Sequence, residues 1–228
     1  MRKSSQKIFA LLMALVMLIG VIPVPAFAAE GDPVVVIAGS DYQQSGSTTP
    51  KSNTTNILNR IEQDYTKESG VVKGFIFGGD YSQSLNSSST TTSGINELKG
   101  VVQGVYGTGL NEVYVQGNHD AAVSGLTATG AHDTDYYGVF SINEDDFPSG
   151  GSVSSTMLTN LQNYLNGKVN EGYKKPIFVV THLPLHKTNR YDSNGTGASI
   201  FNVLNEAGGK GLNIIFLFGH NHSGGYDA

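Results

Sequence analysis

Short apolar runs alternate with helix-type patterns along most of the chain, and this alternation predicts the fold. Residues 34–38 form an unbroken apolar run, which is typical of a strand buried on both faces. Similar runs predict strands at 74–77, 112–116, 136–142, 177–180 and 214–218. Apolar positions at helical spacing predict helices from about 52 to before 70, and over about 95–105, 157–165 and 200–204. The alternation predicts an α/β protein whose first three strands form a parallel sheet.

Residue types that bind metals follow five of these runs. Because the carboxyl ends of parallel strands meet at one edge of a sheet, we expect these side chains to lie close together. The residues are Asp41, Gln43, Asp80, Asn118, His119, His182, His220 and His222. They include four of the six histidines, which argues against placement for packing alone. Carboxylate, imidazole and amide ligands together favour Mn, Fe or Zn over Ca or Mg.

The N-terminal segment has the pattern of a secretory signal peptide. Basic residues precede an apolar run over 8–22, which is too short for a comfortable membrane span. Ala26 and Ala28 then offer small residues where a signal peptidase cleaves. We therefore predict a signal peptide over 1–28, a single domain over 29–228, and a secreted or cell-wall-associated bacterial protein. An uncleaved membrane anchor is the alternative, and no stable membrane span is expected after cleavage. We also expect the domain to continue beyond Ala228.

Composition excludes several classes of function. Three of the 14 basic residues and none of the 19 acidic ones lie in 1–28, so the remainder has a net charge of −8. An acidic chain without a basic run is not a generic nucleic-acid partner. There is no cysteine, so disulfides and thiolate chemistry are excluded. The pattern leaves the oligomeric state open.

The order of the strand-end motifs resembles the calcineurin-like metallophosphoesterase superfamily. The motifs are Gly79-Asp80, the GNHD segment at 117–120, the lone His182, and the GHNH segment at 219–222. The resemblance covers essentially the whole chain after the signal peptide. It implies an α/β fold with two mixed β-sheets packed as a sandwich and flanked by helices, in an α/β/β/α order. It also implies two divalent metal ions, with Mn expected and Fe or Zn as alternatives.

The resemblance assigns roles to the strand-end residues. Asp80 would bridge both metals. Asp41, Gln43 and His222 would complete the first site, and Asn118, His182 and His220 the second. His119 would bind a phosphoryl oxygen or protonate the leaving group. From its adjacency to His119, we expect Asp120 to orient the imidazole as a second catalytic residue.

Two departures from the family pattern change the expectation. Gln43 stands where the family has a histidine, and its neutral amide oxygen suits a harder ion such as Mn²⁺, weak binding, or contact through water. A glutamine that touches no metal remains an alternative. Gln83 stands where the protein-phosphatase branch has an aspartate, which argues against that branch. The purple acid phosphatase pattern also fails at this position.

These observations predict an exported, dinuclear metal-dependent phosphoesterase. Phosphomonoesters, phosphodiesters and pyrophosphates remain open, with diesters or nucleotides slightly favoured as small-molecule substrates. The alternative is a non-catalytic metal-containing binding module at the cell surface, in which the altered first site activates no water. A metal-dependent hydrolase of another ester is a further rival. His186, Lys187 and Arg190 could meet a substrate phosphate, although a solvated loop is the favoured interpretation.

Overall fold

The computed structural model describes residues 34–44, 49–65, 71–149, 152–185 and 197–221. The predicted signal peptide, His222, and the loop of His186, Lys187 and Arg190 lie outside these residues. Within them, the protein has two β-sheets and four α-helices, and it is of the α/β class.

The first sheet is built from alternating strands and helices, as predicted. Its elements are β1 (Val35–Gly39), α2 (Thr49–Tyr65), β2 (Val72–Phe77), α3 (Ser88–Tyr106) and β3 (Asn111–Tyr114). The strands are ordered β1-β2-β3, and both neighbouring pairs are parallel. The predicted parallel sheet is therefore confirmed. The expectation of two mixed sheets is wrong for this one, because its described strands pair only in parallel.

The second sheet is mixed. Its elements are β4 (Gly130–Ala131), β5 (Gly138–Ile142), α4 (Ser155–Asn170), β6 (Ile177–Thr181), α5 (Ala198–Gly209) and β7 (Ile214–Leu217). The order is β4-β5-β6-β7, with β4 antiparallel to β5 and the other pairs parallel. The sequence pattern misses β4 because two residues carry no periodicity. Ser154 caps α4 by accepting a hydrogen bond from the Met157 amide.

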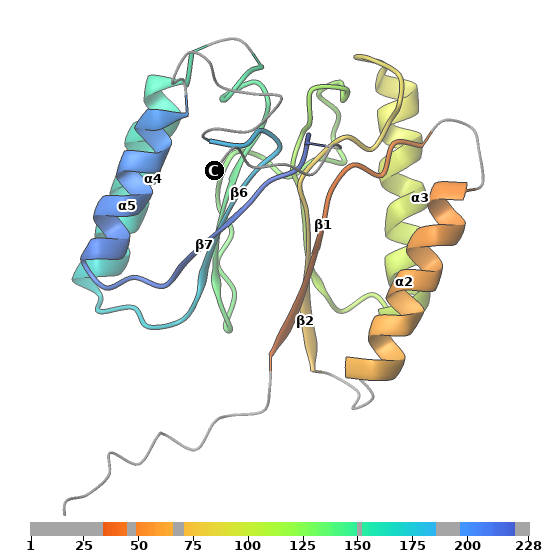
Figure 1. The fold of residues 1–228 in the computed structure, drawn as a ribbon, viewed down its shortest axis with the longest axis horizontal. Helices are drawn as coiled ribbons and strands as arrows, with labels where there is room; N and C mark the ends of the chain where they lie inside the picture. Colours follow the sequence, from red (N-terminus) through yellow and green to blue (C-terminus); the bar gives the residue numbers. More distant parts are fainter. Residues whose placement is uncertain (1–33, 45–48, 66–70, 150–151, 186–196, 222–228) are drawn as a thin grey trace, which may run out of the picture. The chain divides into compact units, whose positions relative to one another are not determined.

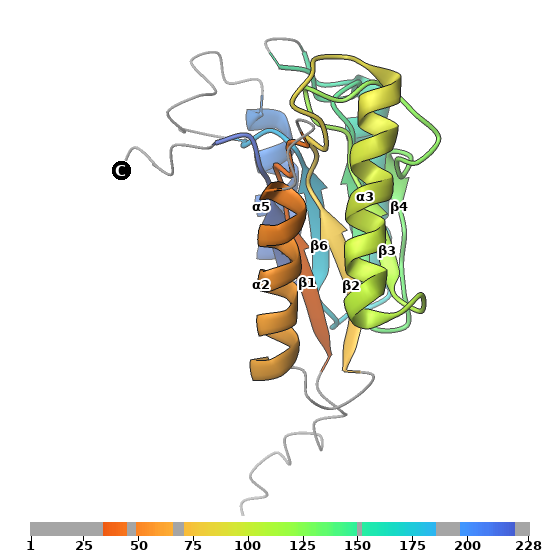
Figure 2. The same cartoon turned by 90° about the vertical axis from the view of Figure 1, so that its right-hand side faces the viewer.

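Three groups of buried side chains hold these elements together. One joins α2 and α3 to the first sheet, with Leu98 and Phe75 among its members. Another joins α4 and α5 to the second sheet, around Leu161 and Val179. A third draws on strands of both sheets. Figure 1 shows α2 and α3 on one side of the strands and α4 and α5 on the other, and Figure 2 shows α2 and α3 covering the first sheet.

The parallel strands of both sheets run in the same general direction, toward the upper part of Figure 1. Their carboxyl ends therefore lie at one end of the sheets, and the loops that follow them can meet there. Among the described residues, no helix is both long and apolar enough to cross a membrane.

Candidate metal centre

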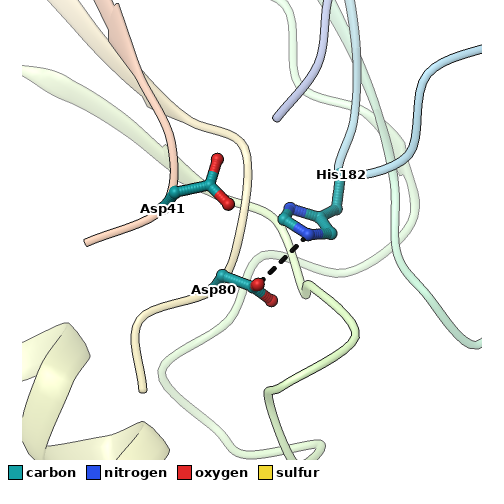
Figure 3. A group of neighbouring side chains, drawn as sticks. All are labelled: Asp41, Asp80 and His182. Carbon is teal, nitrogen blue, oxygen red and sulfur yellow. Dashed lines mark ion pairs between the residues drawn. The ribbon is translucent and has the colours of Figure 1, made fainter. Parts of the chain in front are cut away.

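Three of the predicted ligands converge where the strands end. Asp41 follows β1, Asp80 follows β2, and His182 follows β6 directly. One ligand atom from each lies within 4.8 Å of the others. Figure 3 shows the three side chains pointing toward one another. Asp80 and His182 are buried. Two carboxylates and an imidazole brought this close form a set that can hold a metal ion.

Hydrogen bonds fix the orientation of the His182 ring. Its Nδ1 lies 2.6 Å from the carbonyl oxygen of Gly78. A carbonyl can only accept, so Nδ1 carries the proton. Nε2 then faces the site, 3.0 Å from Oδ1 of Asn118 and 3.3 Å from Oδ2 of Asp80. Metal-binding histidines commonly donate their second ring nitrogen to a backbone carbonyl in this way.

Asn118 joins His182 to His220. Its Oδ1 lies 2.8 Å from Nδ1 of His220, and the two imidazole rings meet edge to face with centroids 5.3 Å apart. The structure therefore brings together the three residues predicted to complete the second metal site. The backbone amide of His220 also donates to the Asp41 carboxylate, with N···O distances of 3.1 and 3.3 Å. This contact ties the end of β7 to the end of β1.

The rest of the predicted first site is less complete. Gln43 lies beside Asp80, because its backbone amide donates to the Asp80 carbonyl oxygen at 2.9 Å. His222 lies outside the described residues. Asp41 and Asp80 are therefore the members of this set whose side chains are brought together.

Four predicted ligands adopt a backbone conformation that side chains disfavour. Asp41, Gln43, Asp80 and His220 have φ angles of 59°, 48°, 59° and 67°. Among the other described residues that are not glycine, only Asn86 has a positive φ. Such conformations cost on the order of 1 kcal/mol each and persist where the surroundings impose them, often at functional sites. The concentration of this strain at the strand ends supports a functional role for the cluster.

Two glycines allow the loops to approach one another. A Cβ at Gly117 would lie 2.3 Å from Oδ1 of Asp80, and a Cβ at Gly79 would lie 2.6 Å from the amide nitrogen of Gly117. Gly79 also has a φ of 90°, which favours glycine. The glycines of the GD and GNHD motifs are thus required by the close packing of the β2 and β3 loops around Asp80.

His119 also lies at the centre, although it is partly exposed. Its backbone amide donates to Oδ1 of Asp80 at 3.0 Å. The ring Nδ1 is 3.0 Å from the carbonyl oxygen of Gln83, so Nδ1 is the donor. Nε2 lies 4.0 Å from Oδ2 of Asp80. The ring is thereby oriented with Nε2 toward the Asp80 side of the cluster.

Asp120 does not orient His119 as predicted, because its side chain faces the backbone of the β2 loop. Oδ2 accepts hydrogen bonds from the amides of Asp80 and Gly117 at 2.7 and 2.9 Å. Oδ1 accepts from the amides of Tyr81 and Ser82 at 3.0 and 3.4 Å. The residue that orients the His119 ring is Gln83, through its carbonyl. Asp120 instead positions Asp80.

The electrostatics of the cluster favour a positive charge within it. Burial acts to raise the pKa of Asp80, but the hydrogen bond and charge of His182 and the His119 amide lower it on balance. Burial acts to lower the pKa of His182, but its hydrogen bond with Asp80 and the charges of Asp80 and Asp41 raise it on balance. The site thus stabilises a carboxylate beside a cation, which is also the condition that a bound metal ion satisfies.

Glu144 is a nearby carboxylate that the sequence reasoning missed. It follows β5, and its pKa responds to the charges of His182 and Asp80. Oε1 accepts a hydrogen bond from the Ser149 amide at 2.6 Å, while the buried Oε2 has no hydrogen-bond partner among the described residues. Burial raises the pKa of Glu144 to about 7. An acidic turn directly after a predicted strand was the signal available in the sequence.

The donor set fits a divalent transition metal. Carboxylates from Asp41 and Asp80, the imidazole Nε2 of His182, and the amide oxygen of Asn118 mix ligand types as Mn, Fe and Zn sites do. The fit rests on this donor chemistry and on the protonation of Nδ1 in His182, which leaves the Nε2 lone pair for a metal.

Comparison with known proteins adds no assignment, because neither the models of protein families nor the curated proteins include a match to this chain.

Proposed function

We propose that this protein is an exported metal-dependent phosphoesterase with a dinuclear centre at Asp80. The observation that carries the proposal is the convergence of Asp41, Asp80 and His182, with ligand atoms within 4.8 Å. The resemblance of the motifs to calcineurin-like metallophosphoesterases supplies the reaction class. An α/β/β/α sandwich, in which the two sheets pack face to face, is the arrangement we propose. The buried cluster shared by both sheets supports it.

The proposed metals divide the ligands between two sites. Asp80 would serve both. Asp41, Gln43 and His222 would hold one ion, while Asn118, His182 and His220 would hold the other. The mutual contacts of the second set, at 2.8 and 3.0 Å from Asn118 Oδ1, support this grouping. Mn²⁺ is the ion we propose, because an amide at Gln43 suits a harder ion than a third imidazole would.

The reaction we propose is hydrolysis of a phosphomonoester or phosphodiester bond. Water adds its oxygen to phosphorus, the bond from phosphorus to the alcohol oxygen breaks, and the departing alkoxide takes up a proton. Two divalent cations supply a hydroxide nucleophile near neutral pH and positive charge for the phosphoryl oxygens. Asp80 and His182 would hold these ions, and contacts with Asp120 and Gly78 fix the orientation of these two residues.

His119 is the residue we propose to deliver the proton. Its Nδ1 donates to Gln83, so Nε2 is the atom that can carry a proton to the leaving group or a hydrogen bond to a phosphoryl oxygen. The side chain is 23% exposed, which leaves it accessible to a substrate. Asp120 acts on the metal centre indirectly, because it accepts hydrogen bonds from the loop that carries Asp80.

Metal-dependent turnover tests the proposal. Purified protein stripped of metal would be titrated with Mn²⁺ and assayed on p-nitrophenyl phosphate and bis-p-nitrophenyl phosphate. We expect turnover that requires metal and that Asp80→Asn abolishes, while Asp135→Asn, a change at an exposed aspartate, retains it. Absence of turnover from folded, metal-loaded protein would reject the enzyme and favour the binding module.

A substitution at Gln43 distinguishes an active enzyme from a non-catalytic module that only binds metal. In an enzyme, Gln43→His should change the preferred metal while turnover persists in both proteins. In a module that lacks activity because its first site is too weak, the same substitution should create turnover where the unaltered protein has none.

Leaving-group dependence tests the role of His119. We expect His119→Gln to reduce kcat/KM about 100-fold or more for an alkyl phosphate, whose leaving alkoxide needs a proton. The loss for p-nitrophenyl phosphate should be clearly smaller, because p-nitrophenolate is a stable anion. Equal losses for the two substrates would assign His119 to binding phosphoryl oxygens instead.

A further inference from the structure

A polar pocket adjoins the candidate metal centre on the side of α2. It has a volume of about 500 Å³, within the range of ligand-binding pockets. Asp41 lines it, and so does Gln83, whose carbonyl holds the His119 ring. The pocket therefore touches both the metal-ligand set and the loop that orients the proposed proton donor.

Backbone hydrogen bonds make the inner wall of this pocket rigid. The amide of Gln43 donates to the Asp80 carbonyl oxygen, and that of Gln44 donates to the Tyr81 carbonyl oxygen, at 2.9 and 2.8 Å. The amide of Gln83 then donates back to the Gln44 carbonyl oxygen at 3.1 Å. The loops after β1 and β2 are joined in this way, so the wall is formed before any substrate binds.

The chemistry of the lining is that of neutral polar groups. Amide and hydroxyl side chains come from Ser40, Gln43, Asn53, Thr54 and Gln83. Ile57 and Phe77 add apolar surface. Among the described residues that line the pocket, Asp41 is the only charged one, and no lysine or arginine is present. Proteins that bind a second anionic group usually pair it with arginine or lysine.

We propose that this pocket receives the alcohol part of the substrate, and that it selects an uncharged, hydroxyl-bearing leaving group over an anionic one. The inference rests on the proposed phosphoesterase function and adds the substrate class. Hydroxyl groups of a polyol or sugar can exchange hydrogen bonds with Asn53, Thr54 and Gln83. A carboxylate or second phosphate there would find no lysine or arginine among the described lining residues to pair with.

A matched pair of substrates tests the selection. Glycerol 3-phosphate and 3-phosphoglycerate share a carbon skeleton and a primary phosphate, but their leaving groups are neutral and anionic, respectively. We expect kcat/KM for glycerol 3-phosphate to exceed that for 3-phosphoglycerate at least tenfold. A ratio near one, or the opposite preference, would overturn the inference. So would turnover of p-nitrophenyl phosphate without turnover of glycerol 3-phosphate.

Two substitutions on α2 test whether the pocket causes the preference for glycerol 3-phosphate. Asn53 lines the pocket, whereas Asn59 is exposed on the same helix and lines a different hollow beside α3. Asn53→Lys should lower the ratio at least fivefold by giving the anionic leaving group a cation. Asn59→Lys adds the same charge and should leave the ratio unchanged. Equal changes in both variants would show a general charge effect and contradict a role for the pocket.

A binding measurement separates this inference from the proposed function. In protein labelled with ¹⁵N, glycerol 3-phosphate should shift the side-chain amide signals of Asn53 but not those of Asn59, and 3-phosphoglycerate should shift them less. If no phosphate ester is hydrolysed, the phosphoesterase proposal fails, while these shifts would still support a polyol pocket. Absence of the Asn53 shift would overturn the pocket itself.

Discussion

Asp120 acts on the site through the backbone rather than through its neighbour in the sequence. Its two carboxylate oxygens accept four amide hydrogen bonds, from the loop that carries Asp80 and from Gly117. Its side chain is almost fully buried, and burial raises its pKa to about 6 despite the lowering effect of these hydrogen bonds. The loop therefore depends on an acceptor at this position.

We predict that Asp120→Asn destabilises the protein by about 2–4 kcal/mol, because an amide NH₂ would face backbone donors that have lost their acceptor. The affinity for Mn²⁺ should fall as well, since Asp80 would no longer be held in place. Urea unfolding and metal titration measure the two effects. Asp135→Asn is the control and should change stability by less than about 0.5 kcal/mol. A stable variant with unchanged affinity would contradict the positioning role.

The raised pKa of Glu144 predicts that the stability of the metal-free protein depends on pH. Its folded pKa of about 7 lies above the ordinary value of 4.5, mainly because burial disfavours the charged carboxylate. The folded state therefore binds more protons than the unfolded state between these values. Glu144 thus lowers the free energy of unfolding as the pH rises from about 4.5 to 7, by on the order of 2 kcal/mol.

Glu144→Gln should remove this slope. The variant should match the unaltered protein near pH 4.5 and become more stable than it at pH 7 and above, as measured by urea unfolding at a series of pH values. Asp145→Asn, at the exposed neighbouring position, controls for a general change of charge. A constant difference between variant and parent at all pH values would show that Glu144 does not titrate in this window.

The sequence predicted the side chains of the site better than their partners. Residue type and position at a strand end were enough to place Asp41, Asp80 and His182 together. Adjacency could not give the direction of the Asp120 side chain, because consecutive residues in a tight turn point to different surroundings. Nor could it show that a carbonyl at Gln83 holds His119, since every residue carries that group.

At the scale of elements, Gly117 in a strand-end loop and Gly104 in α3 should respond oppositely to alanine. Gly117→Ala would bring a Cβ within 2.4 Å of the Asp80 amide nitrogen. We expect a cost of on the order of 3 kcal/mol and a loss of metal affinity. Gly104 lies in the helix with nothing within 4 Å of its added Cβ. Gly104→Ala should stabilise the protein by about 0.5–1 kcal/mol.

Thermal or urea unfolding of the two alanine variants checks this contrast. Equal effects would mean that helix propensity, not loop packing, dominates at both positions.

The element boundaries themselves followed the sequence closely for β2, β6 and β7, where the apolar runs are sharp. Helix α3 begins at Ser88, well before the predicted start, because the polar residues at its beginning carry little apolar periodicity.

At the scale of the whole molecule, the alternating pattern predicted the parallel first sheet, and the structure confirms it. The first three strands form a parallel sheet because each is joined to the next by a helix. The pattern could not show where that sheet ends and a second begins. That division depends on contacts between residues far apart in the chain, such as Ile76 and Val139 in the cluster shared by both sheets.

A bound metal should also stabilise the folded molecule as a whole, because the proposed ligands come from five strand ends that are dispersed in the unfolded chain. Removing the metal with a chelator should therefore lower Tm, and Mn²⁺ should restore it in a concentration-dependent way. A Tm that is the same with chelator and with saturating Mn²⁺ would indicate that the folded state does not bind this ion selectively.

The most direct test of the metal centre is the number of Mn²⁺ ions bound by metal-stripped protein, measured by isothermal titration calorimetry. We predict two ions for the unaltered protein. Asp80→Asn should lose this binding while circular dichroism shows that it remains folded, because Asp80 is the proposed bridging ligand. Failure of the folded protein to bind Mn²⁺, or equal binding by Asp80→Asn, would contradict the account.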